Sequence, residues 1–308
     1  MNRTKPKFAW LNGDILPWDA CLIHARSQAA FWGANVFEGI RAYWNEKNQQ
    51  LYIYRLADHL KRLRESMKCI DMPATFDDNS ITEACLTVLK KNAYREDIHL
   101  VIVAGFGFGD NYDSLGYTTD TLMHITALPM PRSPRYDFGA QAAITTWRRI
   151  SDESMPPRIK TGANYHNSRL AQHEVVRNGF DTAIFLNQRG TISEAPGSCI
   201  AMVSRGQIIS PPGSSGVLEG ITLDSIRKIA QHKLGIEFIQ REIDRTEMYL
   251  ADEVFLCGTL AEIQPVISLD RKKIADGIPG PITRALQEQY ELEVRLDPSD
   301  RLTLAVTI

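Results

Sequence analysis

Short runs of apolar residues alternate along the chain with longer segments in which apolar residues recur at helical spacing. The segment 57–70 predicts an amphipathic helix, because its apolar residues lie on one face and its charged residues on the other. We expect that charged face, which includes Arg62, to be solvated. The run Leu51–Tyr54 is rich in aromatic and β-branched residues, which predicts a strand directly before this helix. Residues 8–16 are predicted to form two short strands, because Asn12-Gly13 favours a hairpin turn between them.

The rest of the chain shows the same mixture of patterns. We expect strands over 98–104, 121–128, 141–147, 236–243, 254–256 and 265–267, helices over 80–92, 164–178, 221–234 and 282–290, and hairpins over 182–192 and 199–209. The helix 80–92 carries Glu83 three residues after Ser80, the spacing of a capping box. Because strands and helices are mixed without a regular strand-helix-strand rhythm, the predicted fold class is α+β.

A proline-rich stretch predicts where the chain divides. Pro129, Pro131 and Pro134 remove backbone donors and favour an extended conformation, as in a linker. A chain of 308 residues suits two domains. We therefore expect an N-terminal α+β domain over 1–128, a linker over 129–137 and a C-terminal α+β domain over 138–308, each with a mixed sheet and helices.

Composition narrows the class of protein. The 35 Lys and Arg residues nearly balance 37 Asp and Glu residues, so the chain lacks the positive charge that nucleic-acid binding requires. We find no apolar run long enough to cross a membrane and no secretory signal. Five scattered cysteines without a CxxC pair argue against a disulfide framework or a zinc site and favour a reducing cytoplasm. The histidines lack metal-ligand spacing, and we expect no metal.

Several residues that suit one cofactor are spread over the second half of the chain. Lys160 supplies an amine, Tyr165 a phenol and Glu194 a carboxylate. Gly220-Ile221-Thr222 opens a predicted helix, whose N-terminal amides suit a phosphate, and Cys257-Gly258-Thr259 is a second small-residue turn. Pyridoxal phosphate requires this combination of groups. By contrast, Gly105–Gly109 has GxGxG spacing and predicts only a flexible loop.

The sequence resembles the class IV aminotransferases, which have the pyridoxal-phosphate fold type IV. The matching segments follow the family order: Phe37–Arg41, Arg55 in 54–60, Lys160 with Tyr165, Ile192–Glu194, Leu218–Thr222, Tyr249–Phe255 and Gly258–Ile263. The Phe37–Arg41 segment resembles the branched-chain subgroup. The resemblance implies an amino-group transfer between an L-amino acid and a 2-oxo acid, with pyridoxal phosphate as cofactor and a homodimer as the assembly.

The resemblance also implies a role for each matching residue. Lys160 would hold the cofactor as a Schiff base and move the α-proton, since a lysine amine readily loses its charge in a desolvated site. Glu194 would pair with the pyridine nitrogen, and Tyr165 would bond the ring's phenolic oxygen. Arg55 would clamp the phosphate. The remaining cofactor-binding positions implied are Gly197, Leu218, Gly220, Ile221, Thr222, Gly258 and Thr259.

Substrate recognition departs from the family pattern. The positions implied to bind substrate are Trp32, Phe37, Arg41, His99 and Leu260, and Trp32 stands where tyrosine is common. Asp97 and His99 replace the tyrosine and arginine of bacterial branched-chain enzymes, where the arginine receives the distal carboxylate of glutamate. A neutral imidazole is a poorer carboxylate clamp than a guanidinium. Cys199 replaces a usual asparagine.

These departures lead to a hypothesis about the substrate. We expect a side chain other than that of valine, leucine or isoleucine, polar or basic, with Asp97, Asp110 and Asp113 as an acidic entrance. Two other functions remain open. One is another reaction of this scaffold: an aminodeoxychorismate-like lyase, a D-amino-acid transaminase or an amine transaminase. The other is a binding protein without catalysis.

Overall fold

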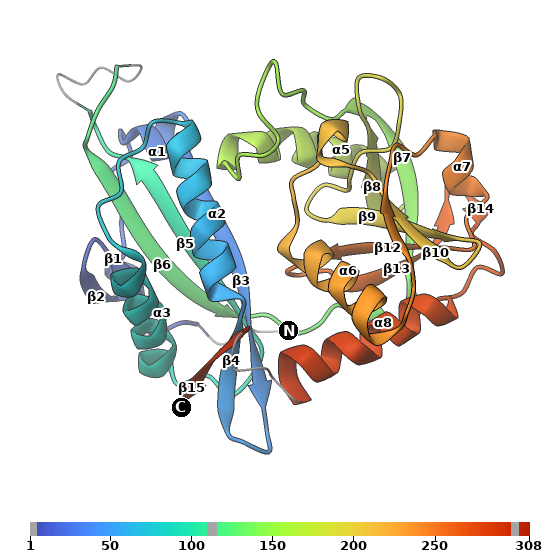
Figure 1. Ribbon diagram of the computed structural model, residues 1–308. Coiled ribbons are helices and arrows are strands. Elements are labelled where there is room, and N and C mark those ends of the chain that lie inside the picture. The colour runs from blue at the N-terminus through green and yellow to red at the C-terminus, as the bar shows by residue number, and fades with distance from the viewer. Residues whose placement is uncertain (1–4, 110–115, 297–301) are drawn as a thin grey trace. The chain divides into compact units, whose positions relative to one another are not determined.

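The computed structural model describes residues 5–109, 116–296 and 302–308. These residues form two compact units, which Figure 1 shows. Unit 1 comprises the described residues of Met1–Pro131, Ile159–Ala163 and Glu293–Ile308. Unit 2 comprises Arg132–Arg158 and Asn164–Leu292.

Unit 1 is built on a seven-stranded sheet with the order β15-β4-β3-β5-β6-β1-β2. Every neighbouring pair of strands in this sheet is antiparallel. The predicted hairpin of 8–16 is confirmed, since β1 and β2 pair across Asn12-Gly13. The strands are β1 (Phe8–Leu11), β2 (Asp14–Pro17), β3 (Asn35–Asn45), β4 (Gln50–Tyr54), β5 (Ile98–Phe106), β6 (Thr121–Pro129) and β15 (Thr303–Thr307).

Two long helices cover one face of this sheet (Figure 1). They are α2 (Leu56–Cys69) and α3 (Asp78–Asn92), and the short helices are η1 (Trp18–Ala20) and α1 (Gln28–Phe31). The apolar stripe of α2, including Leu60 and Leu63, packs in one core cluster with Ile40 of β3. The predicted capping box is wrong: α3 begins two residues earlier, and the side chain of Asp77 accepts the Ser80 N–H.

The opposite face of the sheet positions the candidate site. In the antiparallel register of β3 and β5, Phe37 lies opposite Val103, Gly39 opposite Val101 and Arg41 opposite His99. Because side chains alternate along a strand, these residues share one face. We call it the candidate substrate face. It carries Gly39, the apolar side chains of Phe37, Val101 and Val103, and the polar side chains of Arg41 and His99.

Unit 2 contains an eight-stranded mixed sheet with the order β11-β10-β9-β12-β13-β7-β8, and β14 pairs with β13. The pairs β10–β11, β7–β13 and β7–β8 are parallel. The strands are β7 (Ala140–Arg148), β8 (Thr182–Leu186), β9 (Cys199–Ser204), β10 (Gln207–Ser210), β11 (Phe238–Gln240), β12 (Glu253–Gly258), β13 (Glu262–Leu269) and β14 (Lys272–Lys273). Of the hairpin predicted over 182–192, only the first arm forms a strand, β8; the returning arm meets it through the Leu186–Ile192 bridge and a few further backbone hydrogen bonds.

Helices pack against the sheet of unit 2. Ala171 and Val175 of α5 contact Phe185 of β8, and α6 and α8 lie side by side (Figure 1). The helices are α4 (Arg135–Phe138), α5 (Tyr165–Arg177), α6 (Ile221–Lys233), α7 (Arg245–Tyr249) and α8 (Pro281–Glu291). Short turns are η3 (Gly162–Asn164), η4 (Gly213–Ser215) and the π-helical η5 (Leu292–Leu296).

The division of the chain differs from the predicted domains. It falls between Pro131 and Arg132, but two later segments return to unit 1. Lys160, predicted to belong to the domain 138–308, lies in unit 1 because its carbonyl accepts the Phe37 N–H at 2.9 Å. The C-terminal β15 joins unit 1 because it pairs with β4 over residues 303–307.

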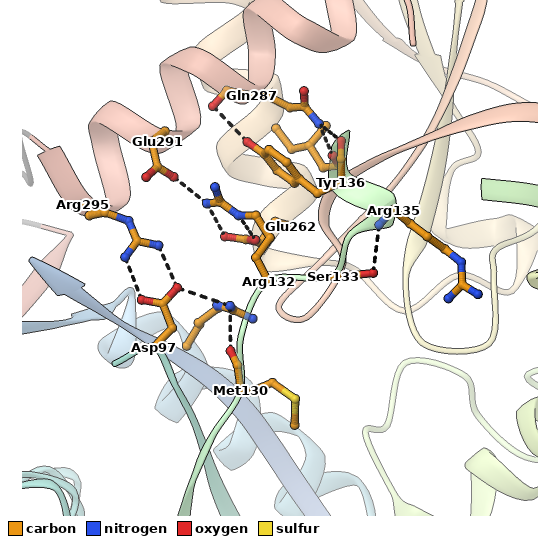
Figure 2. Close-up of polar contacts among 12 residues, drawn as sticks. Asp97, Met130, Arg132, Ser133, Arg135, Tyr136, Glu262, Gln287, Glu291 and Arg295 are labelled. Carbon is orange, nitrogen blue, oxygen red and sulfur yellow. Dashed lines mark hydrogen bonds and ion pairs between the residues drawn. The ribbon is translucent and has the colours of Figure 1, made fainter. Parts of the chain in front are cut away.

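The second half of the predicted linker is part of unit 2. Arg132 pairs with Glu262 at 2.6 Å and with Glu291 at 2.5 Å (Figure 2). Tyr136 of α4 is buried, and its carbonyl accepts from the amide of Gln287 at 2.8 Å. These contacts hold residues 132–137 against unit 2, so they do not form a free linker.

Candidate active site

Backbone hydrogen bonds fix Lys160 in unit 1. Its carbonyl accepts from Phe37, its own N–H donates to the Ser66 hydroxyl at 3.2 Å, and Thr161 bridges to Val36. The side chain is half-buried, and its Nζ lies 4.9 Å from the centroid of the Phe37 ring. The amine therefore lies on the face of β3 that carries Phe37.

A buried ion network lies on the other side of β3, between the strand and α2. Glu38 is fully buried and accepts from Arg62 Nε and Nη2, each at 2.8 Å, and His59 Nδ1 lies 2.7 Å from it. Burial raises the pKa of Glu38, but the hydrogen bonds and charges of Arg62 and His59 outweigh burial and lower it to about 2. Arg62 was expected to be solvated, so that prediction is wrong. The sequence reasoning missed this network, since no local pattern indicates its partners.

Arg55 lies where β4 passes into α2. It has φ of 54°, in the left-handed region, and it occupies the N-cap position of α2. Its side chain is buried, and Nε donates to Asp58 at 2.7 Å. A guanidinium beside the N-terminal amides of a helix adds to the positive potential there, which suits a phosphate.

His99 lies over Gly39 on the candidate substrate face. A Cβ atom at Gly39 would come within 2.7 Å of His99 Nε2, so only glycine leaves room for the imidazole. Burial lowers the pKa of His99, and the charges of Arg41 and Lys160 lower it further, to about 4. The imidazole is therefore neutral near pH 7, as the sequence reasoning expected. Trp32 follows α1, where it is 54% exposed and its ring contacts Phe31.

Asp97 is engaged inside unit 1. Its two carboxylate oxygens each accept from Arg295 at 2.7 Å (Figure 2), and Oδ1 also accepts the Trp44 N–H at 3.0 Å. Burial raises the pKa of Asp97, but Arg295, the Trp44 amide and Arg41 lower it overall. The structure thus argues against Asp97 as an acidic entrance for a basic substrate. Asp110 and Asp113 lie outside the described residues.

Unit 2 holds Glu194 against a cation. Its carboxylate is buried, lies 2.7 Å from Arg149 Nη2, and accepts the Leu218 N–H at 3.1 Å. Arg149 in turn donates from Nε to the Gly216 carbonyl at 3.3 Å. Glu194 is therefore held in one orientation beside the Arg149 guanidinium. Tyr165, the first residue of α5, is half-buried.

The two predicted small-residue turns lie on neighbouring elements of unit 2. Cys199 and Cys257 are register partners on β9 and β12. A Cβ atom at Gly220 would lie 2.6 Å from Cys199 Sγ, and one at Gly258 would lie 3.3 Å from the Gly197 carbonyl. Unit 2 thus brings together most of the predicted cofactor-binding residues: Glu194, Gly197, Leu218, Gly220, Ile221, Thr222, Gly258 and Thr259.

The groups present in unit 2 fit pyridoxal phosphate. Ile221 and Thr222 start α6, where N-terminal amides can bind a phosphate. Glycine at positions 220 and 258 lets the two turns pack closely against Cys199 and the Gly197 carbonyl, respectively. Leu260, next to this turn, is partly exposed. In the described part of the chain, no three His, Cys, Asp or Glu residues are grouped to hold a metal ion, and no helix suits a membrane span.

Comparison with known proteins agrees with this geometry. Residues 35–269 match the model of the amino-transferase class IV family, so the chain belongs to the class IV aminotransferases. It is a pyridoxal-phosphate-dependent transaminase with the α+β architecture of fold type IV, which confirms the predicted family, fold class and cofactor.

Relatives and solved structures cover nearly the whole chain. A probable branched-chain-amino-acid aminotransferase of Aquifex aeolicus is 36% identical over 94% of this chain and 92% of its own length. The branched-chain-amino-acid aminotransferase of Salmonella typhimurium is 37% identical over 94% of each chain. The structure of the branched-chain amino acid aminotransferase of Thermobaculum terrenum in its PLP form aligns with TM-score 0.91 and 41% identity, covering 98% of this chain and 99% of that one.

Proposed function

We propose that this transaminase moves the amino group between L-amino acids with branched apolar side chains and a 2-oxo acid. This replaces the polar or basic substrate expected from the sequence, because Asp97 is bound to Arg295. The surroundings of Lys160 carry the proposal: its Nζ lies 4.9 Å from the Phe37 ring centroid. Gly39, Val101 and Val103 are neighbours on the same sheet face. An apolar face beside the amine suits an aliphatic side chain. The activities named for the relatives support the same substrate class.

In this proposal Lys160 holds the cofactor covalently through Nζ and moves the α-proton of the substrate. A half-buried amine beside an aromatic ring suits this task, because a lysine amine is the nucleophile that forms a Schiff base with an aldehyde. Pyridoxal phosphate, when bound, accepts the negative charge that develops at the substrate α-carbon. The backbone hydrogen bonds to Phe37 and Ser66 fix the main chain from which the Lys160 side chain extends.

The remaining cofactor contacts are proposed from the charges and donors of the chain. Glu194, held by Arg149, would keep a proton on the pyridine nitrogen, and Tyr165 would donate to the phenolic oxygen. Arg55 and the amides of α6 would bind the phosphate. The other proposed contacts are Gly197, Leu218, Gly220, Ile221, Thr222, Gly258 and Thr259.

The substrate contacts are proposed from the chemistry of each side chain or turn. Phe37 would form an apolar wall, and His99 would present a neutral imidazole. Backbone amides after Gly258, next to Leu260, would donate hydrogen bonds to the α-carboxylate, since N–H groups of such a turn bind anions. Trp32 and Arg41 complete the proposed set.

We also infer that the protein acts as a homodimer. Leu22, Phe31 and Trp32 are more than half exposed and lie within eleven residues of one another in the sequence. Clustered exposed apolar side chains favour burial against a partner. Light scattering after gel filtration tests this, and a monomer at micromolar concentration contradicts it.

The cytoplasm is the proposed compartment. Cys85, Cys199 and Cys257 are buried free thiols, and Cys21 and Cys69 are free as well. Unpaired thiols persist in a reducing environment. Cell fractionation with an antibody against the protein tests this, and recovery in an oxidising compartment contradicts it.

A donor panel tests the proposed reaction. The holoenzyme is incubated with L-leucine and 2-oxoglutarate, and 4-methyl-2-oxopentanoate is measured, with D-leucine as the matched control. We expect product from the L-enantiomer only. Product from D-leucine, or turnover of an amino-deoxychorismate-like substrate without a 2-oxo acid, contradicts the proposal.

A further inference from the structure

Arg41 is a buried guanidinium whose hydrogen-bonding capacity is only partly used. The residue is 2% exposed, and its Nη2 donates to the Met130 carbonyl at 2.9 Å. Among the described residues, its Nε and Nη1 are buried and lack a hydrogen-bond partner. A buried charged donor without an acceptor is costly, so such a group indicates a ligand or a function.

The carboxylate nearest to Arg41 is shared with a second arginine, so a bound anion could pair with the Arg41 guanidinium. Asp97 lies 3.4 Å from Arg41 but 2.7 Å from Arg295, whose guanidinium it binds with both oxygens. The Asp97 carboxylate therefore lies beside two guanidinium groups, and its shorter hydrogen bonds are those from Arg295. Among the described residues of unit 1, Arg41 therefore shares its carboxylate partner with Arg295, which binds that carboxylate more closely.

The position of Arg41 places that charge on the candidate substrate face. Arg41 lies directly opposite His99, and Gly39 separates it from Phe37, whose ring contacts Lys160 Nζ. Both Arg41 and Lys160 are close enough to His99 for their charges to lower its pKa. His99 is therefore neutral, and Arg41 is the cation next to it.

We propose that Arg41, and not His99, receives the distal carboxylate of a dicarboxylic substrate, namely a five-carbon 2-amino dicarboxylate and its 2-oxo acid. Two parallel N–H donors of a guanidinium match the two oxygens of a carboxylate. A neutral imidazole offers at most one donor. The assignment rests on the amino-transfer activity proposed above and specifies its second substrate.

Equilibrium binding to the holoenzyme tests the assignment without catalysis. Glutarate is the probe, and pentanoate, which lacks one carboxylate, is its matched control. We expect Arg41→Met to weaken glutarate binding roughly tenfold to a hundredfold, the range for one charged hydrogen-bonded pair. Arg41→Lys keeps the charge without the paired donors and is expected to fall between. Arg177→Met, an exposed arginine of α5, is the control for the substitution itself.

Kinetics of the two half-reactions separate specificity from general damage. We expect Arg41→Met to lower the ratio of kcat/KM for 2-oxoglutarate to kcat/KM for 4-methyl-2-oxopentanoate by a similar factor. His99→Gln replaces one neutral group with another and is expected to preserve that ratio. The ratio is also expected to stay constant from pH 6 to pH 9, since the lowered pKa of His99 keeps its imidazole neutral over that range.

The outcomes distinguish this assignment from the proposed function. If L-leucine is not a donor, the proposed function fails, while glutarate binding still tests Arg41. If leucine reacts but glutarate affinity is unchanged in both Arg41 variants, the assignment is overturned. The assignment is also overturned if His99→Gln lowers the ratio of the two kcat/KM values. The same holds if folded Arg41→Lys lowers kcat/KM equally for both 2-oxo acids.

Discussion

Arg295 and Asp97 meet through two hydrogen bonds of 2.7 Å, one from each terminal nitrogen of the guanidinium. The pair joins the start of β5 to the segment that follows α8, almost 200 residues later in the chain. Figure 2 shows the two side chains facing each other. A carboxylate used in this way cannot serve a basic substrate, so the pair limits both the fold and the substrate class of unit 1.

Removal of this carboxylate should destabilise the protein strongly. Asp97→Asn leaves Arg295 without its anionic partner where both side chains are less than 20% exposed. We expect a loss of about 3 kcal/mol in the free energy of unfolding, measured in guanidinium chloride. Asp78→Asn breaks the exposed pair with Arg64 and should cost at most about 1 kcal/mol. Equal losses in the two variants contradict this prediction.

The Glu38 network should make stability depend on pH in the acid range. The pKa of Glu38 is about 2 in the folded protein and has an ordinary value of 4.5, so the unfolded chain binds a proton first as the pH falls. The contribution of Glu38 is thus present above pH 4.5 and lost towards pH 2. Its full size is on the order of 3 kcal/mol.

Replacement of this carboxyl tests the assignment. Glu38→Gln should be less stable at pH 7 and should show a shallower decrease of the free energy of unfolding between pH 4.5 and pH 2. Glu65→Gln, at an exposed residue of α2, the helix that carries Arg62 and His59, is the control. If Glu38→Gln and the parent protein have the same pH slope, the buried network does not set acid stability.

The contact between Gly220 and Cys199 should appear as coupling between two substitutions. A Cβ atom at Gly220 would lie 2.6 Å from Cys199 Sγ, so Gly220→Ala is expected to cost about 1–3 kcal/mol through overpacking. Cys199→Ala removes the sulfur, and the double variant should regain at least roughly 1 kcal/mol of that loss. Additive effects of the two substitutions on thermal unfolding contradict this.

Lys160→Gln should abolish the covalent bond to the cofactor while the fold is retained. Mass spectrometry of borohydride-reduced, digested holoprotein should find the adduct on Lys160 in the parent protein and none in the variant. Lys61→Gln, an exposed lysine of α2, should keep the adduct and the absorbance of the cofactor. An adduct on another lysine in the parent protein contradicts the role of Lys160.

Local sequence patterns correctly predicted the helices and hairpins that are specified by short-range spacing of apolar residues or by a turn. The helix of 57–70 and the hairpin of 199–209 match α2 and the β9–β10 pair, because helical spacing and a turn residue specify them locally. The longest strand, β3, was missed, since Glu38 and Arg41 interrupt its apolar pattern. β15 was missed because it is stabilised by pairing with β4, far away in the chain.

The sequence by itself determined the family, the cofactor and the elements with a local hydrophobic period. Only the tertiary structure decided that Lys160 belongs to unit 1, that Arg62 serves Glu38, and that Asp97 is taken by Arg295. The reason is physical: burying a charge is costly unless a partner of opposite charge meets it. Such partners come from distant segments, so no local pattern contains them.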